Sequence, residues 1–307
     1  MKKLLIPFML IFVLILSACN GDSTDKKDDA SSKDKKPETI TYQSENGPVK
    51  VPADPQRVVV LSSYTGDLIK LGVNMVGVDA WSKKNPNFQD TVKDIEEVSD
   101  ENIEKIIELE PDLIIGLSTA KNIDKLKKIA PTVTFTYGKL DYLEQHIEIG
   151  KLVNKEKEAT EWAKDFEKRA EDAGKEIKAK IGEDATVSVI ENYDKQLYVY
   201  GDNWGRGTEI LYQAMKLNMP EKVKQTALKE GYYAISTEVL PEYAGDYLIL
   251  SKFKDTDNSF QETETYKNIP AVKNNRVFEI DANSFYFNDA TTLELQLDFF
   301  KSAFLGE

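Results

Sequence analysis

An arginine and a tryptophan stand among glycines near the middle of the chain, in the stretch YGDNWGRG at residues 200–207. Glycine is favoured where the backbone needs a positive φ or where another group approaches it closely. The guanidinium of Arg206 carries five N–H donors in a rigid fork, which matches paired oxygen atoms. The stretch therefore predicts a loop that presents Trp204 and Arg206 to a ligand carrying oxygen atoms.

Aromatic residues recur where the sequence predicts loops and the ends of strands. In open α/β sheets, ligands bind beyond the carboxyl ends of the strands, where side chains from several loops converge. Any single tyrosine or phenylalanine is more often part of a core than of a ligand site. Beside Arg206 and Trp204, a further set predicts a wall suited to a bulky organic ligand with a few anionic oxygens: Tyr64, Trp81, Tyr137, Tyr198 and Tyr286.

Other kinds of site find little support in the composition. The chain has one histidine, His146, whereas zinc and manganese sites usually need several nitrogen or sulfur ligands. Catalysis by a Ser-His-Asp or Cys-His set would also need His146, and no nucleophile motif stands near it. No phosphate loop or dinucleotide fingerprint occurs. The 53 acidic residues leave a hydrolase with a pair of carboxylates as an open alternative.

The elements that must position these residues alternate between short branched runs and helical segments, which predicts an α/β fold. A first set of strands is expected at 57–62, 75–80, 112–117 and 132–137, with helices at 64–71, 102–109 and 121–129. A second set of strands is expected at 186–191, 196–200, 246–250 and 276–281, with helices at 207–215, 237–243 and 289–304. We therefore predict two α/β lobes, at 40–155 and 182–307, joined by a single long α-helix, with a ligand cleft between the lobes.

Residues 156–181 are predicted to form the connecting helix. The segment has no proline and is rich in alanine, glutamate and lysine, which favour helix. A helix of this length would reach roughly 39 Å, about the diameter of a domain. We expect a stiff strut between the lobes, and hence only modest closure of the cleft. Packing of the helix against one lobe alone is the alternative.

The N-terminal residues predict export. Residues 1–18 combine Lys2 and Lys3 with an unbroken apolar run, as in a secretory signal peptide. The sequence LSAC, which ends at Cys19, resembles the lipobox of bacterial lipoproteins, in which this cysteine carries the lipid. Residues 19–39 are predicted to be a disordered tether because they have almost no apolar side chains to bury. The net charge of −13 makes nucleic acid an improbable partner.

Taken together, these features resemble the iron-siderophore substrate-binding lipoproteins of Gram-positive ABC importers. YGDNWGRG, with LYVY before it and TEILYQAM after it, is similar to the signature of the ferric hydroxamate branch. Further matches are PTVTFTY ending at Tyr137, NIEKIIELEPDLII at 102–115, EYAGDYLIL at 242–250 and FND at 287–289. The resemblance runs from about residue 40 to the end of the chain.

The resemblance implies a receptor that captures an iron(III)-hydroxamate siderophore and performs no chemistry of its own. Arg206 would donate hydrogen bonds to the hydroxamate oxygens, while Tyr198, Trp204 and Tyr137 would line the pocket. Iron would be carried within the siderophore, so the protein itself would bind no metal or cofactor directly.

The resemblance also implies partners and a location. Glu104 and Glu238, one in each lobe, match the carboxylates that dock onto arginines of an ABC transporter permease. An acid in the first turn of a helix is also favoured by the helix dipole, which is the structural alternative. The protein would be a monomer, anchored by the lipid on Cys19 at the extracellular face of the cell membrane.

Two departures from the family pattern leave the ligand open. Leu117 and Tyr286 stand where some relatives have an aromatic residue and a tryptophan, respectively, so the particular hydroxamate is undetermined. The same fold could bind a catecholate, citrate or a corrinoid. From other classes, an exported hydrolase and a structural or adhesive surface protein are the alternatives; the absence of repeats speaks against an adhesive protein.

Overall fold

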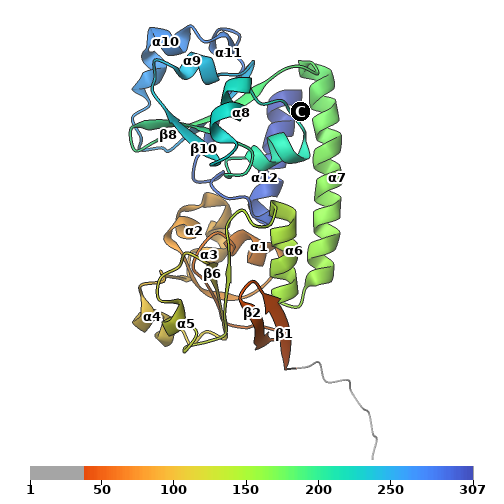
Figure 1. Ribbon diagram of the computed structural model, residues 1–307, viewed down its shortest axis with the longest axis vertical. Helices are drawn as coiled ribbons and strands as arrows, with labels where there is room; N and C mark the ends of the chain where they lie inside the picture. The colour runs from red at the N-terminus through yellow and green to blue at the C-terminus, as the bar shows by residue number, and fades with distance from the viewer. Residues whose placement is uncertain (1–37, 307) are drawn as a thin grey trace, which may run out of the picture. The chain divides into compact units, whose positions relative to one another are not determined.

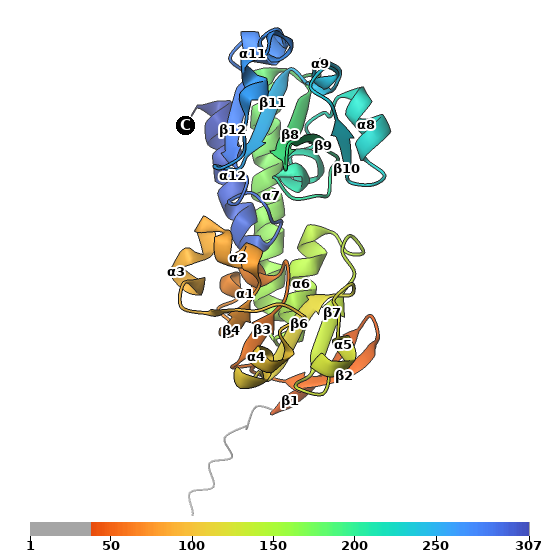
Figure 2. The same ribbon diagram turned by 90° about the vertical axis from the view of Figure 1, so that its left-hand side faces the viewer.

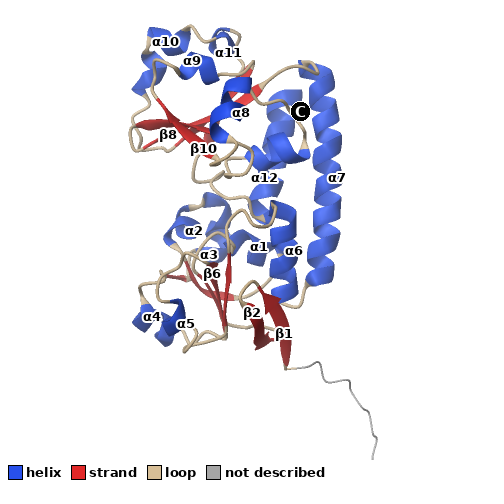
Figure 3. Ribbon diagram, in the orientation of Figure 1, coloured by secondary structure: helices blue, strands red, loops and turns tan. Residues whose placement is uncertain are grey.

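The computed structural model of the chain describes residues 38–306 (Figures 1 and 2). The predicted signal peptide, Cys19 and nearly all of the predicted tether lie outside the described residues. The described part contains two five-stranded sheets, a two-stranded hairpin and the 26-residue helix α7 (Glu156–Ile181). The predicted fold class, two α/β lobes joined by one long helix, is confirmed (Figure 3).

The first sheet is wholly parallel, with the strand order β5-β4-β3-β6-β7. Apolar runs fill its central strands because helices cover both faces of a parallel sheet. The strands are β3 (Val58–Val60), β4 (Met75–Val78), β5 (Glu96–Glu97), β6 (Leu113–Leu117) and β7 (Thr132–Phe135). The helices of this lobe are α1 (Thr65–Lys70), α2 (Ala80–Lys84), α3 (Gln89–Val92), α4 (Ile103–Glu108), α5 (Ile123–Leu126) and α6 (Tyr142–Leu152), with a 3₁₀ turn at Pro86–Phe88.

A hairpin that the sequence pattern did not predict precedes this sheet. It consists of β1 (Thr39–Ser44) and β2 (Gly47–Pro52), paired antiparallel. Its turn is fastened to the lobe beyond β7, because Glu45 Oε2 accepts a hydrogen bond from Thr136 Oγ1 at 2.8 Å. Most residues of the hairpin are exposed or half-buried, so it lacks the apolar run by which the central strands of the two sheets were found.

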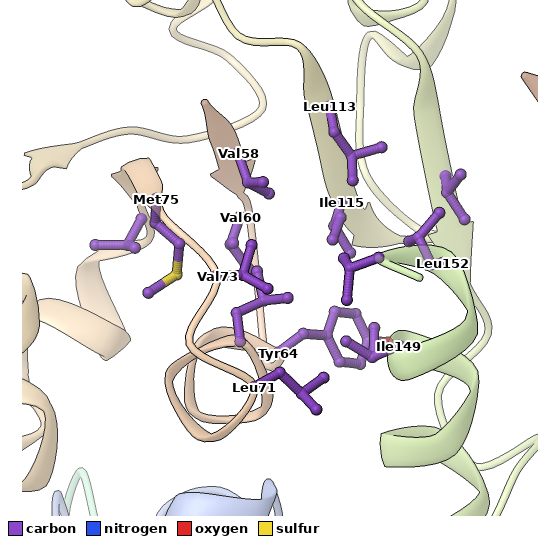
Figure 4. Close-up of a cluster of buried hydrophobic side chains, with 14 of the residues drawn as sticks. Val58, Val60, Tyr64, Leu71, Val73, Met75, Leu113, Ile115, Ile149 and Leu152 are labelled. Atoms are coloured by element: carbon purple, nitrogen blue, oxygen red, sulfur yellow. The ribbon is translucent and has the colours of Figure 1, made fainter. Parts of the chain in front are cut away.

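Side chains between the first sheet, α1 and α6 form the core of this lobe (Figure 4). Val60 and Ile115 lie on the sheet, and the ring of Tyr64 points across the core toward Ile149 of α6. Tyr64 is only 4% exposed and meets the ring of Phe135 edge-on, with 5.4 Å between centroids. Tyr64 is therefore a core residue.

The second sheet is mixed, with the strand order β10-β9-β8-β11-β12. Strands β8, β11 and β12 are parallel, whereas β9 and β10 pair antiparallel. Its strands are β8 (Val187–Tyr193), β9 (Gln196–Tyr200), β10 (Tyr232–Ile235), β11 (Tyr247–Lys252) and β12 (Val277–Asp281). Its helices are α8 (Glu221–Ala227), α9 (Leu240–Tyr243), α10 (Glu264–Lys267), α11 (Pro270–Lys273) and α12 (Ala290–Leu305), with a 3₁₀ turn at Ser259–Glu262.

Several local features of the second lobe differ from expectation, and the short helices α8, α10 and α11 were not predicted. The segment predicted as an α-helix at 207–215 forms a π-helix over Glu209–Ala214. A π-helix is wider than an α-helix and is often found beside functional sites. Strand β10 was not predicted, because three of its four residues are exposed and give no buried pattern.

Helix α7 has the predicted bounds and runs beside both lobes (Figures 1 and 2). Its buried face consists mainly of alanine, with Phe166 and Ile177. Gly174 lies where the helix meets the second lobe, since a Cβ atom there would come within 2.3 Å of the Met215 carbonyl oxygen. Within residues 38–306, no helix is both long and apolar enough to cross a membrane.

An ion cluster around Glu294 joins helices at the junction of the lobes. Glu294 of α12 accepts hydrogen bonds from Lys70 of α1 at 3.0 Å, from Trp162 Nε1 of α7 at 2.6 Å and from both terminal nitrogens of Arg169. Burial raises the pKa of this carboxyl, but the bonds from Arg169, Trp162 and Lys70 outweigh burial and lower it to about 2. The cluster therefore remains charged at neutral pH.

A second, fully buried cluster lies next to it. Asp67 of α1 accepts a hydrogen bond from the backbone N–H of Ala290 at 3.0 Å, and its carboxylate lies 2.8 Å from Nδ1 of His146. Asp289 caps α12 by accepting the Thr292 N–H. The amino end of α12 is thus held against α1 and α6, and His146 is a core residue rather than a surface one.

Candidate functional site

Two adjoining cavities lie where the first sheet's strands end and the second lobe begins. The first, here called the aromatic pocket, has a volume of about 250 Å³ and is walled by six aromatic residues of the second lobe. These are Tyr193, Tyr198, Tyr200, Trp204, Tyr232 and Tyr286. The second, here called the interlobe pocket, has a volume of about 350 Å³ and shares Trp204, Arg206 and Tyr286 with the first.

The interlobe pocket receives residues from the carboxyl ends of four parallel strands. Ser62 follows β3, Asp79 follows β4, Leu117 ends β6 and Tyr137 follows β7. This is the edge at which open parallel sheets bind ligands, because the loops that leave neighbouring strands converge there.

The glycine-rich loop at 201–207 has a backbone that needs its glycines. Gly205 and Gly207 have φ of 69° and 84°, in the left-handed region. A Cβ atom would approach the Tyr286 carbonyl oxygen to 2.4 Å at Gly205 and the Phe300 ring to 2.5 Å at Gly207. Arg206 itself has φ of 59°, a conformation that costs an L-residue about 1–2 kcal/mol. The glycines thus allow the loop to pack against α12 and the segment before it.

Arg206 forms a buried ion pair with Glu191 of β8. Its Nε and Nη2 atoms donate to the two carboxylate oxygens of Glu191 at 3.1 Å and 2.9 Å. Its Nη1 atom donates to the Trp204 carbonyl oxygen at 3.2 Å. Arg206 is 7% exposed and Glu191 fully buried. The loop therefore holds the guanidinium rigidly at the edge of both pockets, instead of presenting it as an unpaired charge.

Two hydroxyl groups also donate hydrogen bonds to the Glu191 carboxylate. Tyr200 Oη donates to Oε1 at 2.8 Å and Ser251 Oγ donates to Oε2 at 2.7 Å, so each oxygen accepts two hydrogen bonds. Burial alone would lower the pKa of Arg206, but the facing Glu191 carboxylate raises it above its ordinary value. Arg206 is therefore charged over the whole physiological range.

Aromatic rings enclose the guanidinium. The carbon at its centre lies 4.4 Å from the centroid of Tyr286 and 4.9 Å from that of Tyr200. Tyr286 in turn stacks on Trp81 of the first lobe, with 4.4 Å between centroids and 8° between planes. Cation–π contacts of this kind stabilise a partly desolvated arginine.

A second contact joins the lobes at Trp204. The ring of Tyr137 meets that of Trp204 edge-on at 5.4 Å, and the Tyr137 hydroxyl donates to the Asn203 carbonyl oxygen at 3.2 Å. Tyr232 of β10 covers another side of Trp204 at 4.9 Å. The indole is half-buried between the two lobes.

The structure brings most of the expected ligand residues together. Arg206, Trp204 and Tyr286 line both pockets; Tyr198 lines the aromatic pocket, and Trp81 and Tyr137 line the interlobe pocket. Tyr64 does not join them. It borders a third, more polar cavity of about 460 Å³, here called the rear chamber, which adjoins the interlobe pocket at Ser63, Tyr137 and Asn288.

The two expected docking carboxylates lie apart from these pockets. Glu104 is exposed in the first turn of α4, as predicted. Glu238 is exposed in the turn before α9, so it precedes the helix that was expected to contain it. The pKa of Glu238 is lowered by hydrogen bonds from Ser236 and from its own backbone N–H.

Several residues of the site gave no clear signal in the sequence. Glu191 and Ser251 lie inside buried strands and look like core positions with an incidental polar side chain. Tyr232 belongs to the strand that was missed. Asp79 fell inside the strand predicted at 75–80, whereas the observed strand β4 ends at Val78 and Asp79 caps the unpredicted helix α2. Its carboxylate caps α2 through the Trp81 and Ser82 N–H groups.

Within residues 38–306, no group of three or more histidine, cysteine, aspartate and glutamate side chains is arranged to hold a metal ion. The geometry instead holds Arg206 rigidly among aromatic rings, where it can donate hydrogen bonds to a ligand. Arg206 has three of its five N–H groups engaged by Glu191 and Trp204, which leaves two for other partners.

Comparison with known proteins shows the family to which the chain belongs. A model of the periplasmic binding protein family matches residues 58–284. The chain belongs to this family. Its members are binding proteins and not enzymes, which excludes the hydrolase alternative.

Named relatives resemble the chain over most of its length. The "iron(3+)-hydroxamate-binding protein YxeB" of Bacillus subtilis is 38% identical over 97% of this chain and 95% of its own. The solved FhuD protein from S. pseudintermedius is 40% identical over 88% of this chain and 99% of that one, with a TM-score of 0.80. FhuD2 from Staphylococcus aureus with bound ferrioxamine B is 38% identical over 82% of this chain and 99% of that one, with a TM-score of 0.79.

Proposed function

We propose that the protein captures an iron(III)-hydroxamate siderophore outside the cell and delivers it to an ABC transporter permease. The observation that carries the proposal is the Arg206 guanidinium, held by Glu191 among aromatic rings at the carboxyl ends of the first sheet's strands. The names of the relatives, which bind iron(III) hydroxamates and ferrioxamine B, support the same ligand class.

The chemistry of such a chelate suits the two pockets. Three hydroxamates surround iron(III) with oxygen atoms that accept hydrogen bonds, and the two free N–H groups of Arg206 can donate to them. The organic chain of the siderophore offers apolar surface to Trp204, Tyr198, Trp81, Tyr137 and Tyr286. Iron would travel inside the ligand, and no protein side chain would need to bind it.

The proposal is tested by fluorescence titration of residues 20–307 with ferric ferrioxamine B. Trp204 and Trp81 border the pockets, so a coloured chelate bound there should quench the tryptophan emission in a saturable way. Arg206→Ala should weaken binding by at least about tenfold, since a charge-assisted hydrogen bond contributes about 1.5–3 kcal/mol. Trp204→Phe should reduce the quenching amplitude. Absence of saturable quenching by this complex in the wild-type protein would refute the proposal.

Two exposed carboxylates are proposed to dock the permease. Glu104 and Glu238 lie on different lobes, exposed and away from both pockets, where they could meet basic residues of a membrane partner. Glu104→Ala and Glu238→Ala should leave siderophore binding unchanged and reduce iron uptake by cells. Normal uptake by the double variant would contradict this role.

We further propose a lipid anchor at Cys19, on the strength of the LSAC sequence after the predicted signal peptide. It would hold the protein, as a monomer, at the extracellular face of the membrane. Cys19→Ser should release the protein into the medium and into the aqueous phase of a detergent partition. Retention of the variant in the membrane fraction would count against the anchor.

A further inference from the structure

The charged side chains that line the two pockets do not give the site a net positive charge. Among the described residues that line the aromatic pocket and the interlobe pocket, Arg206 is the one cation, and two carboxylates, Glu191 and Asp79, accompany it. Lys84 lies over the ring of Trp81 at 5.4 Å but does not line either pocket. Lys139 and Lys216 border only the rear chamber.

Glu191 is fully paired within its own network. Each of its oxygens accepts two hydrogen bonds, from Arg206 together with Tyr200 or Ser251, and its side chain is completely buried. A buried ion pair of this kind is held together by its hydrogen bonds. Arg206 therefore offers directed N–H groups to a ligand without offering a net positive charge.

Asp79 adds a second acidic group from the other lobe. It is 7% exposed and is fixed by the N–H groups of Trp81 and Ser82 and by the hydroxyl of Ser82. Asp79 lines the interlobe pocket while its carboxylate caps the first turn of α2, and burial raises its pKa above the ordinary value despite these hydrogen bonds.

A site with these charges should bind iron chelates of different net charge with different affinity. Three hydroxamates carry one negative charge each and cancel the charge of iron(III), whereas three catecholates carry two each and leave a trianion. A trianion that enters a low-dielectric site needs several cations to replace its hydration. A site with one cation and two carboxylates cannot supply them.

We propose that Glu191 and Asp79 are specificity-determining residues that exclude anionic iron chelates from a site that accepts neutral ones. This inference rests on the proposed function, because it assumes that the two pockets hold the chelate. It assigns to Glu191 a role beyond orienting Arg206: it removes the attraction that an unpaired arginine would have for anions.

The experiment compares two ligands across matched variants. The dissociation constants of a neutral ferric trihydroxamate, ferrichrome, and of a ferric tris-catecholate are measured by tryptophan quenching at low and at physiological salt. Glu191→Gln and Asp79→Asn each remove one charge with nearly unchanged shape. Ser251→Ala is the control, because it removes a hydrogen bond to Glu191 but keeps the charge.

We expect the wild-type protein to bind the trihydroxamate in strong preference to the tris-catecholate. In Glu191→Gln and Asp79→Asn the ratio of the two affinities should move toward the tris-catecholate by at least about tenfold, because a trianion gains from each carboxylate removed. The shift should shrink as salt is added. Ser251→Ala should weaken binding without moving the ratio.

The results distinguish failure of this inference from failure of the proposed function. An unchanged ratio in folded variants, or tight tris-catecholate binding by the wild-type protein, would overturn the inference while hydroxamate binding remained intact. Failure of the wild-type protein to bind the trihydroxamate would instead refute the proposed function. If Glu191→Gln fails to fold, Asp79→Asn alone tests the inference. This variant should fold because asparagine can replace aspartate as a helix cap.

Discussion

Trp204 is held in place at the residue scale by neighbours from both lobes and by a glycine that leaves room for it. Tyr137 and Tyr232 contact its ring from two directions. Gly231, directly before β10, has φ of 83°, and a Cβ atom there would come within 2.5 Å of the indole. The orientation of Trp204 therefore depends on the absence of a side chain at a position remote in sequence.

We expect Gly231→Ala to displace Trp204 and weaken ferric hydroxamate binding. The loss should be about fivefold or more, since an aromatic pair contributes about 1 kcal/mol. Gly72→Ala is the matched control, because Gly72 also has a positive φ but has open space around its Cβ position. Both variants should lose about 1–2 kcal/mol of stability, but only Gly231→Ala should lose affinity in a quenching titration. Equal affinities would contradict the proposed support of Trp204.

Helices meet at the lobe junction in a cluster that responds to pH. Asp289 is fully buried at the amino end of α12, and burial, followed by repulsion from Asp67, raises its pKa to about 7. The other titratable group within this buried cluster is His146, beside Asp67. An aspartate in the unfolded chain ionises near pH 4. Between about pH 4 and 7 the folded protein therefore binds a proton that the unfolded chain has released.

The sign of the effect follows from this difference in bound protons. The contribution of Asp289 to stability is fully present below about pH 4 and is lost as the pH rises through about 7, at a rate of at most about 1.4 kcal/mol per pH unit. Asp289→Asn cannot ionise but keeps the helix cap. The difference in free energy of unfolding between the variant and the wild-type protein should therefore grow in favour of the variant from pH 4 to 7.

Denaturant unfolding at several pH values measures this difference. The control is Asp298→Asn, a change of the same type at an exposed position of the same helix. It reports the effect of the same chemical change at a solvent-exposed position. A difference for Asp289→Asn that has the same pH dependence as this control would show that burial does not shift the pKa of Asp289 in the folded protein.

At the scale of the whole molecule, the described residues form two lobes that are joined at more than one point. The chain crosses between the sheets through α7, and the amino end of α12 also packs on α1, where Glu294 binds Lys70, Trp162 and Arg169. A continuous helix and a charged cluster at the same junction both resist bending. They favour small adjustments at the pockets over a wide hinge movement.

We therefore expect modest closure when the ligand binds. Small-angle scattering of the free and the ferrioxamine-saturated protein should fit a relative rotation of the lobes below roughly ten degrees. Glu294→Ala removes the shared acceptor of the junction and should increase that rotation, whereas Asp298→Ala on the same helix should not. A larger rotation in the wild-type protein would show that the junction is a hinge and not a strut.

The sequence by itself determined those features that depend on neighbours along the chain. Helix α7 was predictable to the residue, because its composition and the absence of proline act locally. The parallel strands other than the exposed two-residue strand β5 were predictable as buried apolar runs, and YGDNWGRG marked the loop that carries Trp204 and Arg206. The exposed strand β10 and the hairpin β1–β2 were missed because neither has a buried apolar run to detect.

Only the tertiary structure decided which residues meet in space. The sequence gives no means of pairing Arg206 with Glu191 and Ser251, because their contact depends on the register of β8 with β11. Tyr64 and Trp81 look alike in the sequence, each after a predicted strand, yet one packs in the core and the other stacks on Tyr286 at the ligand pockets. Such differences arise from long-range packing, in which the free energy of burial is shared among residues that are far apart in the chain.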